Sequence, residues 1–121
     1  MSGTVLVVDN LQFNVDLVKT ILKHGGYKVI SAGSGSQAMT MAKKYKPDLV
    51  LMDLQLPEID GFEITRMLKA NPETSSVKVV AFSALAMAAD RKKALKAGCI
   101  GYITKPVGAR ELLGAVKGFI K

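Results

Sequence analysis

Short apolar runs along the chain predict the strands of a buried sheet. Residues 5–8 and 49–52 are apolar throughout, and a carboxylate, Asp9 or Asp53, follows each run. An apolar run without alternation is typical of a strand covered on both faces, as in a parallel sheet between helices. Three further runs predict strands over residues 27–32, 77–82 and 99–103.

In the segments between these runs, apolar residues recur with the period of a helix. Val15, Val18 and Leu22 recur at a spacing of three to four residues, with Phe13 and Leu17 beside them. A second helix is predicted from Ser34, which forms a capping box with Gln37, to the residue before Pro47. Three more are predicted between Gly61 and Asn71, over the alanine-rich residues 84–97, and over residues 109–120.

Five predicted strands alternate with five predicted helices over residues 1–121, without a linker or a repeat. This alternation favours one doubly wound α/β domain with helices on both faces of a parallel sheet. The carboxyl ends of the strands then share one edge, where such proteins bind ligands. Four polar residues follow four of the strands and are expected to meet there: Asp9, Asp53, Ser83 and Lys105.

The composition excludes several classes of protein. With 121 residues, 49% of them apolar, the chain is long enough to fold and too apolar to be disordered. Its apolar runs are too short to span a membrane, and the start does not resemble a signal peptide. The single cysteine, Cys99, predicts a buried thiol in the reducing cytoplasm.

The formal net charge of +7 is unevenly distributed. Residues 1–63 carry six Lys or Arg and seven Asp or Glu, whereas residues 64–121 carry eleven and three. A basic half is compatible with a solvated face, or with an acidic partner. Direct binding of nucleic acid is not expected, because no recognition element is found.

The polar residues at the predicted sheet edge suit one kind of chemistry. Asp9 and Asp53 favour a hard cation such as Mg²⁺, which keeps several waters and needs only one or two protein carboxylates. Lys105 and Ser83 would face an anion, most simply a phosphoryl group. Asp53 can act as the nucleophile that accepts it as an aspartyl phosphate. The alternative is that these residues only cap turns and helices.

Four motifs follow one another along the chain: V-L-V-V-D at 5–9, D-L-V-L-M-D-L-Q-L-P at 48–57 followed by D-G at 60–61, V-V-A-F-S-A at 79–84 and A-G-C-I-G-Y-I-T-K-P at 97–106. With these motifs the chain resembles a known family, the CheY-like receiver domains of two-component response regulators. The resemblance covers nearly the whole chain. It implies a flavodoxin-like sheet with strands in the order 2-1-3-4-5.

The resemblance also implies how the chain is phosphorylated. Asp53 matches the phosphoacceptor, and Lys105 matches the ammonium that pairs with the new phosphoryl group. Asp9, Asp53 and the backbone carbonyl of Gln55 match the protein ligands of Mg²⁺. The phosphoryl donor would be a sensor histidine kinase or a histidine phosphotransfer protein.

Three further residues are implied to serve the switch. Ser83 matches the hydroxyl that bonds the phosphoryl group, Tyr102 matches the aromatic residue that turns inward with it, and Pro106 follows a peptide bond that is cis in the family. An alternative for Tyr102 is a residue at the sheet edge with its hydroxyl in solvent.

The output face of the family is formed by its fourth helix, fifth strand and fifth helix. Four basic residues of this chain fall on the fourth helix, Arg91, Lys92, Lys93 and Lys96. We hypothesise that the output partner presents an acidic surface.

The chain departs from the family pattern after its first strand. Two consecutive acidic residues are usual there, whereas this chain has Asp9 and Asn10. Asn10 can offer an amide oxygen to Mg²⁺ but no charge. After desolvation is discounted, we expect a loss of ~1–2 kcal/mol in Mg²⁺ binding, roughly ten- to thirtyfold in affinity.

The positions two beyond the phosphoacceptor and two beyond the switch hydroxyl flank the path of attacking water in the family. They are Gln55 and Leu85 here. An apolar leucine cannot orient water, so we expect slow self-dephosphorylation, with Gln55 as the residue that positions the water.

The primary hypothesis is a phosphorylation-controlled switch without a separate substrate, and hence not an enzyme. One alternative is a receiver-like interaction module that signals without phosphate, for which Asn10 is the only hint. Another is an aspartate-nucleophile phosphohydrolase, but those enzymes usually carry a second Asp where this chain has Gln55.

Overall fold

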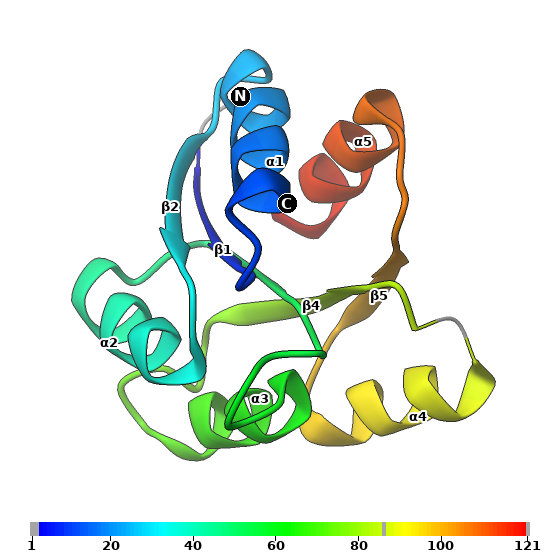
Figure 1. Ribbon diagram of the computed structural model, residues 1–121. Helices are drawn as coiled ribbons and strands as arrows, with labels where there is room; N and C mark the ends of the chain where they lie inside the picture. Colours follow the sequence, from blue (N-terminus) through cyan, green and yellow to red (C-terminus); the bar gives the residue numbers. More distant parts are fainter. Residues whose placement is uncertain (1–2, 86, 121) are drawn as a thin grey trace.

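The computed structural model describes residues 3–85 and 87–120, and its centre is a parallel sheet of five strands (Figure 1). The strand order is β2-β1-β3-β4-β5, as expected for a doubly wound, flavodoxin-like fold. The strands are β1 (Thr4–Val8), β2 (Lys28–Ala32), β3 (Leu49–Met52), β4 (Lys78–Ser83) and β5 (Gly101–Thr104).

Helices cover both faces of the sheet, α1 and α5 on one face and α2, α3 and α4 on the other (Figure 1). They are α1 (Gln12–His24), α2 (Gly35–Tyr45), α3 (Gly61–Ala70), α4 (Ala88–Ala97) and α5 (Ala109–Ile120). Each layer has its own apolar core. Leu22 and Leu112 are fully buried in the first, and Ile64 and Leu68 in the second.

The register of the central strands positions the site. Val8 pairs with Met52, and these are the last residues of β1 and β3. Both strands are buried, as their uninterrupted apolar sequences predict. The two carboxylates that follow, Asp9 and Asp53, are therefore brought to the same sheet edge.

Two predicted boundaries are wrong by two or more residues, both next to α4, and the other strand ends differ by at most one residue. The helix expected from residue 84 begins at Ala88, because Leu85 donates its backbone N–H to the Ser83 hydroxyl instead of entering a helix. The strand expected from residue 99 begins at Gly101, since Cys99 still donates its backbone N–H to Ala94 in α4. None of the described helices is long and apolar enough to cross a membrane.

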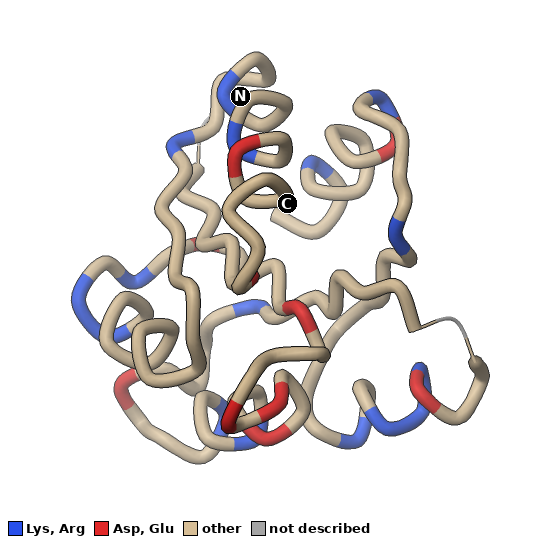
Figure 2. The backbone as a smooth tube through the Cα atoms, in the orientation of Figure 1, with Lys and Arg blue, Asp and Glu red and all other residues tan. Residues whose placement is uncertain are grey.

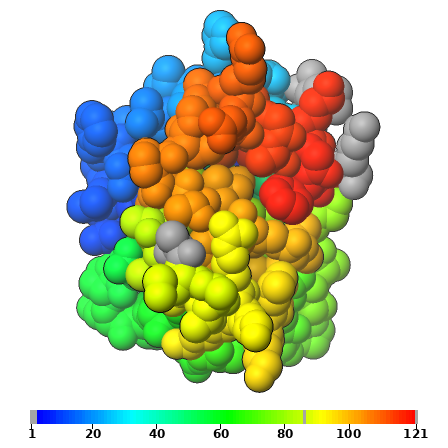
Figure 3. All heavy atoms as spheres, turned by 90° about the vertical axis from the view of Figure 1, so that its right-hand side faces the viewer, coloured from blue at the N-terminus to red at the C-terminus, as the bar shows by residue number. Residues whose placement is uncertain are grey.

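Basic side chains gather along α4. Arg91, Lys92, Lys93 and Lys96 are all exposed, and Figure 2 shows that basic positions recur along this helix. Figure 3 views the molecule from the side on which α4, β5 and α5 form one continuous face. The basic residues predicted for the output face thus lie on the surface.

Candidate functional site

Asp53 lies directly after β3, at the carboxyl edge of the sheet. Its backbone N–H donates to the carbonyl of Val8, which ties it to the end of β1. The residue is only 7% exposed, and its Oδ1 accepts the backbone N–H of Gln55 at 3.0 Å. The other carboxylate oxygen, Oδ2, lies 3.7 Å from Nζ of Lys105.

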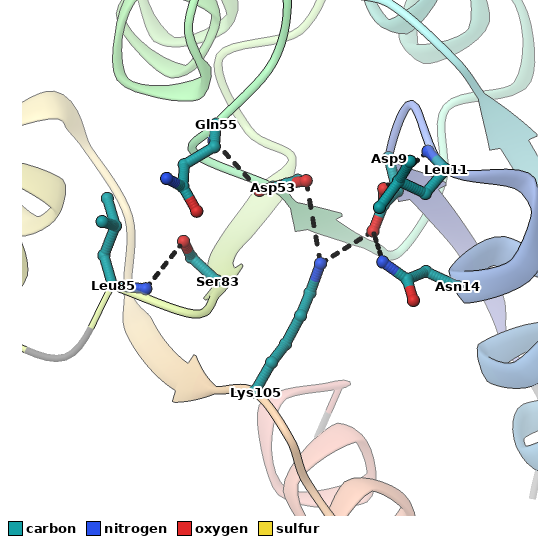
Figure 4. A network of polar contacts seen from close by, with 8 residues as sticks. All are labelled: Asp9, Leu11, Asn14, Asp53, Gln55, Ser83, Leu85 and Lys105. Atoms are coloured by element: carbon teal, nitrogen blue, oxygen red, sulfur yellow. Dashed lines mark hydrogen bonds and ion pairs between the residues drawn. The ribbon is translucent and has the colours of Figure 1, made fainter.

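Asp9 occupies the matching position after β1 and is 3% exposed. Its Oδ1 accepts the backbone N–H of Leu11 at 2.9 Å, next to the first turn of α1. Its Oδ2 accepts Nζ of Lys105 at 2.7 Å and the side-chain amide of Asn14 at 3.4 Å (Figure 4). Asn14 is absent from the residues predicted for the site. A polar residue on the first turns of the helix after Asp9 is the only signal of it in the sequence.

Lys105 reaches the site from the segment after β5. Its backbone N–H donates to the carbonyl of Ser83, and the Lys105–Pro106 peptide bond is cis, the geometry that the family resemblance implies. The ammonium lies between the carboxylates of Asp9 and Asp53 and is closer to Asp9. The structure thus brings together three residues that are far apart in the sequence.

The environment of Asp53 raises the pKa of its carboxyl group. Burial is the main cause, and the negative charge of Asp9 adds to it. The hydrogen bond from Gln55 and the charge of Lys105 act in the opposite direction without cancelling the effect. Asp53 is therefore a more basic carboxylate than an exposed aspartate, and its ionised form is partly desolvated.

Ser83 is the last residue of β4 and is completely buried. In Figure 4, Ser83 and Gln55 lie on one side of Asp53, and Asp9 lies on the other. The Ser83 hydroxyl oxygen accepts the backbone N–H of Leu85 at 3.2 Å, which leaves the hydroxyl hydrogen able to donate elsewhere. The side chain of Gln55 is exposed at the mouth of the site.

Tyr102 is partly exposed on β5, and its hydroxyl is hydrogen-bonded within the protein. It packs against the core beneath α2, α3 and α4, and its hydroxyl donates to the carbonyl of Leu85 at 2.6 Å. Burial raises the pKa of that hydroxyl. The guanidinium of Arg91 lies 5.3 Å from the centre of the ring, on its α4 side. Tyr102 is therefore tied to the segment between β4 and α4.

The donor set at this edge suits a hydrated divalent cation. No group of three His, Cys, Asp or Glu side chains with metal-binding geometry occurs among residues 3–85 and 87–120. Asp9 and Asp53 are nonetheless buried carboxylates with an ammonium between them, which marks the place where positive charge is stabilised. Mg²⁺ that keeps several waters needs no more carboxylates than these two. Asn10, the residue after Asp9, is exposed.

Comparison with known proteins agrees with the geometry. A sequence model of the response regulator receiver domain matches residues 5–117. The polar-differentiation response regulator DivK from Brucella ovis is 34% identical over 120 residues, which cover 99% of this chain and 98% of DivK.

Two solved structures extend the likeness to three dimensions. A CheY-like receiver domain protein from Methanospirillum hungatei is 27% identical, with a TM-score of 0.90 over 99% of this chain and 94% of its own. The second structure is the receiver domain of the sensor histidine kinase PA1611 from Pseudomonas aeruginosa, which has a magnesium ion in its active-site cleft. It is 31% identical, with a TM-score of 0.90 over 99% of this chain and 98% of its own. The chain therefore belongs to the response regulator receiver domains of two-component systems.

Proposed function

We propose that the chain is a phosphorylation-controlled switch that accepts a phosphoryl group on Asp53 from a sensor histidine kinase or a histidine phosphotransfer protein. The observation that carries this proposal is the ammonium of Lys105 between two buried carboxylates, 2.7 Å from Asp9 and 3.7 Å from Asp53. A phosphoryl group on Asp53 would bring its negative charge to that ammonium. Such charge-assisted contacts are stronger than neutral hydrogen bonds.

The two oxygens of Asp53 have different tasks in this proposal. Oδ1 is held by the N–H of Gln55, so Oδ2, which faces Lys105, is the oxygen that attacks. The new bond joins Oδ2 to phosphorus while the bond from phosphorus to the donor histidine nitrogen breaks. The electron pair of that bond stays with the imidazole, which takes up a proton. Lys105 neutralises charge on the phosphoryl oxygens as the transfer proceeds.

Asp9, Asp53 and the backbone carbonyl of Gln55 are the groups that would hold Mg²⁺. The bound ion would supply further charge neutralisation at the phosphoryl oxygens. Asn10 can add an amide oxygen, without the charge that the family usually has at this position.

Leu85 connects the phosphoryl site to the output face. Its N–H donates to Ser83 and its carbonyl accepts from Tyr102, so one residue is bonded to both switch side chains. When the Ser83 hydroxyl donates to a phosphoryl oxygen on Asp53, the segment after β4 is expected to move with it. Tyr102 and the start of α4 would then respond, and with them the face of α4, β5 and α5.

The phosphoryl donor has an apolar surface available close to the site. Phe13 and Leu17, which lie beside the buried stripe of α1, are 78% and 52% exposed. Leu17 lines a groove that continues to Lys105 and Pro106. Because a donor must bring its histidine to Asp53, we propose that it docks on this part of α1.

The chain is proposed to act in the cytoplasm, where its kinase or phosphotransfer partner would present the phosphohistidine. The buried, unpaired thiol of Cys99 is compatible with a reducing compartment. The output partner is proposed to carry an acidic surface that binds the exposed basic residues of α4.

Incubation with acetyl phosphate and Mg²⁺, followed by intact-mass measurement, tests the proposal. We expect the wild-type chain to gain the mass of one phosphoryl group and the Asp53→Asn variant to gain none. Asp16→Asn, a change at an exposed carboxylate on α1, is the control and should gain the group normally. A gain by Asp53→Asn equal to that of the wild type would refute Asp53 as the acceptor.

A further inference from the structure

Asn14 lies at the site without belonging to any of its motifs. It is half-buried on the first turns of α1, and its amide donates to Oδ2 of Asp9 at 3.4 Å. The same oxygen accepts Nζ of Lys105 at 2.7 Å, while Oδ1 accepts the backbone N–H of Leu11 (Figure 4). Of these three donors to Asp9, Lys105 alone carries a charge.

We infer that Asn14 is a positioning residue, which retains the carboxylate of Asp9 when Lys105 turns toward the phosphoryl group on Asp53. The inference rests on the proposed function. Lys105 is 1 Å closer to Asp9 than to Asp53 in this structure, at 2.7 against 3.7 Å. A move of the ammonium toward a phosphoryl group on Asp53 would lengthen its contact with Asp9.

Asp9 is poorly placed to lose that contact. It is 3% exposed, and when one donor withdraws from a buried carboxylate, the donors that remain carry more of its stabilisation. Asn14 donates to the oxygen that Lys105 would leave, so it becomes more important as the ammonium moves. A neutral amide suits this task, since a basic residue there would compete with Lys105 and an acidic one would repel Asp9.

Loss of the Asn14 amide should therefore cost more in the phosphoryl-bound state than in the resting state. We expect Asn14→Ala and Asn14→Leu to lower the affinity for beryllofluoride, a phosphoryl mimic, about three- to tenfold at saturating Mg²⁺. Leucine keeps the approximate size of the side chain without its donor, so it separates loss of the amide from loss of volume.

The experiment is a beryllofluoride titration of the full chain, followed by backbone amide NMR, with thermal unfolding of each variant to verify folding. Gln12→Ala is the matched control, because its amide lies on the same helix and donates to Asp16 at 2.7 Å. Its affinity should equal that of the wild type. In an Asp9→Asn background, titrated at the Mg²⁺ concentration that saturates that variant, Asn14→Ala should have little further effect, since the residue acts through Asp9.

Equal affinities of wild type and Asn14→Ala would overturn the inference, as would a full effect of Asn14→Ala in the Asp9→Asn background. Either result leaves the proposed function intact if the wild-type chain binds beryllofluoride. A wild-type chain that does not bind it would contradict the proposed function itself, and the inference with it.

Discussion

At the scale of single residues, Asp53 and Asp9 differ in the bonds that their carboxylate oxygens make. Asp53 has one oxygen fixed by the N–H of Gln55 and one facing Lys105, whereas both oxygens of Asp9 are bonded. Asp53, whose carboxyl pKa is raised by burial, is thus also the carboxylate with an oxygen left to react. This difference supports Asp53, and not Asp9, as the nucleophile.

Asn10→Asp should strengthen Mg²⁺ binding roughly ten- to thirtyfold, because it restores a negative charge beside Asp9. Mg²⁺ titration followed by backbone amide NMR would measure the two dissociation constants. Gln12→Glu, which also adds one carboxylate to this end of α1, controls for net charge. Equal affinities of wild type and Asn10→Asp would remove the proposed effect.

Gln55→Ala should lengthen the lifetime of the phosphoryl group several-fold, within the range that one positioned group contributes to proton transfer or water attack. The side chain is exposed at the mouth of the site, where it can hold a water, whereas Leu85 cannot. The half-life is measured by intact mass after removal of the phosphodonor. A half-life unchanged from that of the wild type would exclude Gln55 as the residue that positions water.

The sequence identifies Asp9, Asp53, Ser83 and Lys105 because each ends or follows an apolar run, and a parallel sheet brings such positions together. It does not identify Asn14. That contact depends on how α1 is seated against the sheet edge, a tertiary feature that helical periodicity does not encode. For the same reason the closer approach of Lys105 to Asp9 than to Asp53 is visible only in three dimensions.

At the scale of elements, the segment between β4 and α4 shows tertiary contacts overriding local propensity. Alanine favours helix, and this preference predicted helix from residue 84. The hydrogen bonds of Leu85 to Ser83 and Tyr102 keep the start of the segment out of the helix, which begins at Ala88. The same hydrogen bonds of Leu85 form the connection through which phosphorylation is proposed to affect α4.

Tyr102→Phe should loosen this link without preventing phosphorylation. It removes the hydroxyl that donates to the carbonyl of Leu85 at 2.6 Å and leaves Asp53 and Lys105 unchanged. We expect intact mass to show normal phosphorylation, and hydrogen exchange at the start of α4 to become several-fold faster. Tyr45→Phe, at an exposed tyrosine on α2, is the control. Unchanged exchange in Tyr102→Phe would contradict the proposed coupling.

Reversal of charge on α4 tests the proposed acidic output partner. The double change Lys92→Glu and Lys96→Glu should weaken partner binding at least tenfold at low salt, and added salt should weaken binding of the wild type. The same reversal at Lys43 and Lys44, which are exposed on α2, should have little effect. Binding that is insensitive both to salt and to the α4 reversal would count against an acidic partner.

At the scale of the whole molecule, the alternation of strands and helices was enough to predict a doubly wound sheet. The strand order came from the family resemblance, since alternation alone is compatible with more than one order. Which helices share a face, α1 with α5 and α2 with α3 and α4, follows from that order (Figure 1). The fold was therefore predictable almost completely, and only the boundaries next to α4 differ from the prediction by more than one residue.

The stability of the whole molecule is also expected to depend on the ionisation of Asp53. Because its pKa is raised in the folded state, the ionised group destabilises the fold at neutral pH. This destabilisation disappears as the pH falls through the pKa of Asp53 in the folded state toward its pKa in the unfolded chain. Asp53→Asn should therefore raise the melting temperature by a few degrees at pH 7.5, and the gain should shrink at acidic pH.

Thermal unfolding from pH 7.5 to 4.5 measures this dependence, with Asp16→Asn as the exposed control. A lower melting temperature of Asp53→Asn at pH 7.5 would show that the contact with Lys105 outweighs burial and the repulsion from Asp9.

The central claim, that one acyl phosphate forms on Asp53, can be read directly from the modified residue. The chain is phosphorylated by a phosphorylated histidine phosphotransfer domain, reduced with borohydride, which converts an aspartyl phosphate to homoserine, and mapped by peptide mass spectrometry. The account predicts homoserine at position 53 alone. Homoserine at Asp9 or at another carboxylate, or none at position 53 after a measured gain of phosphoryl mass, would contradict it.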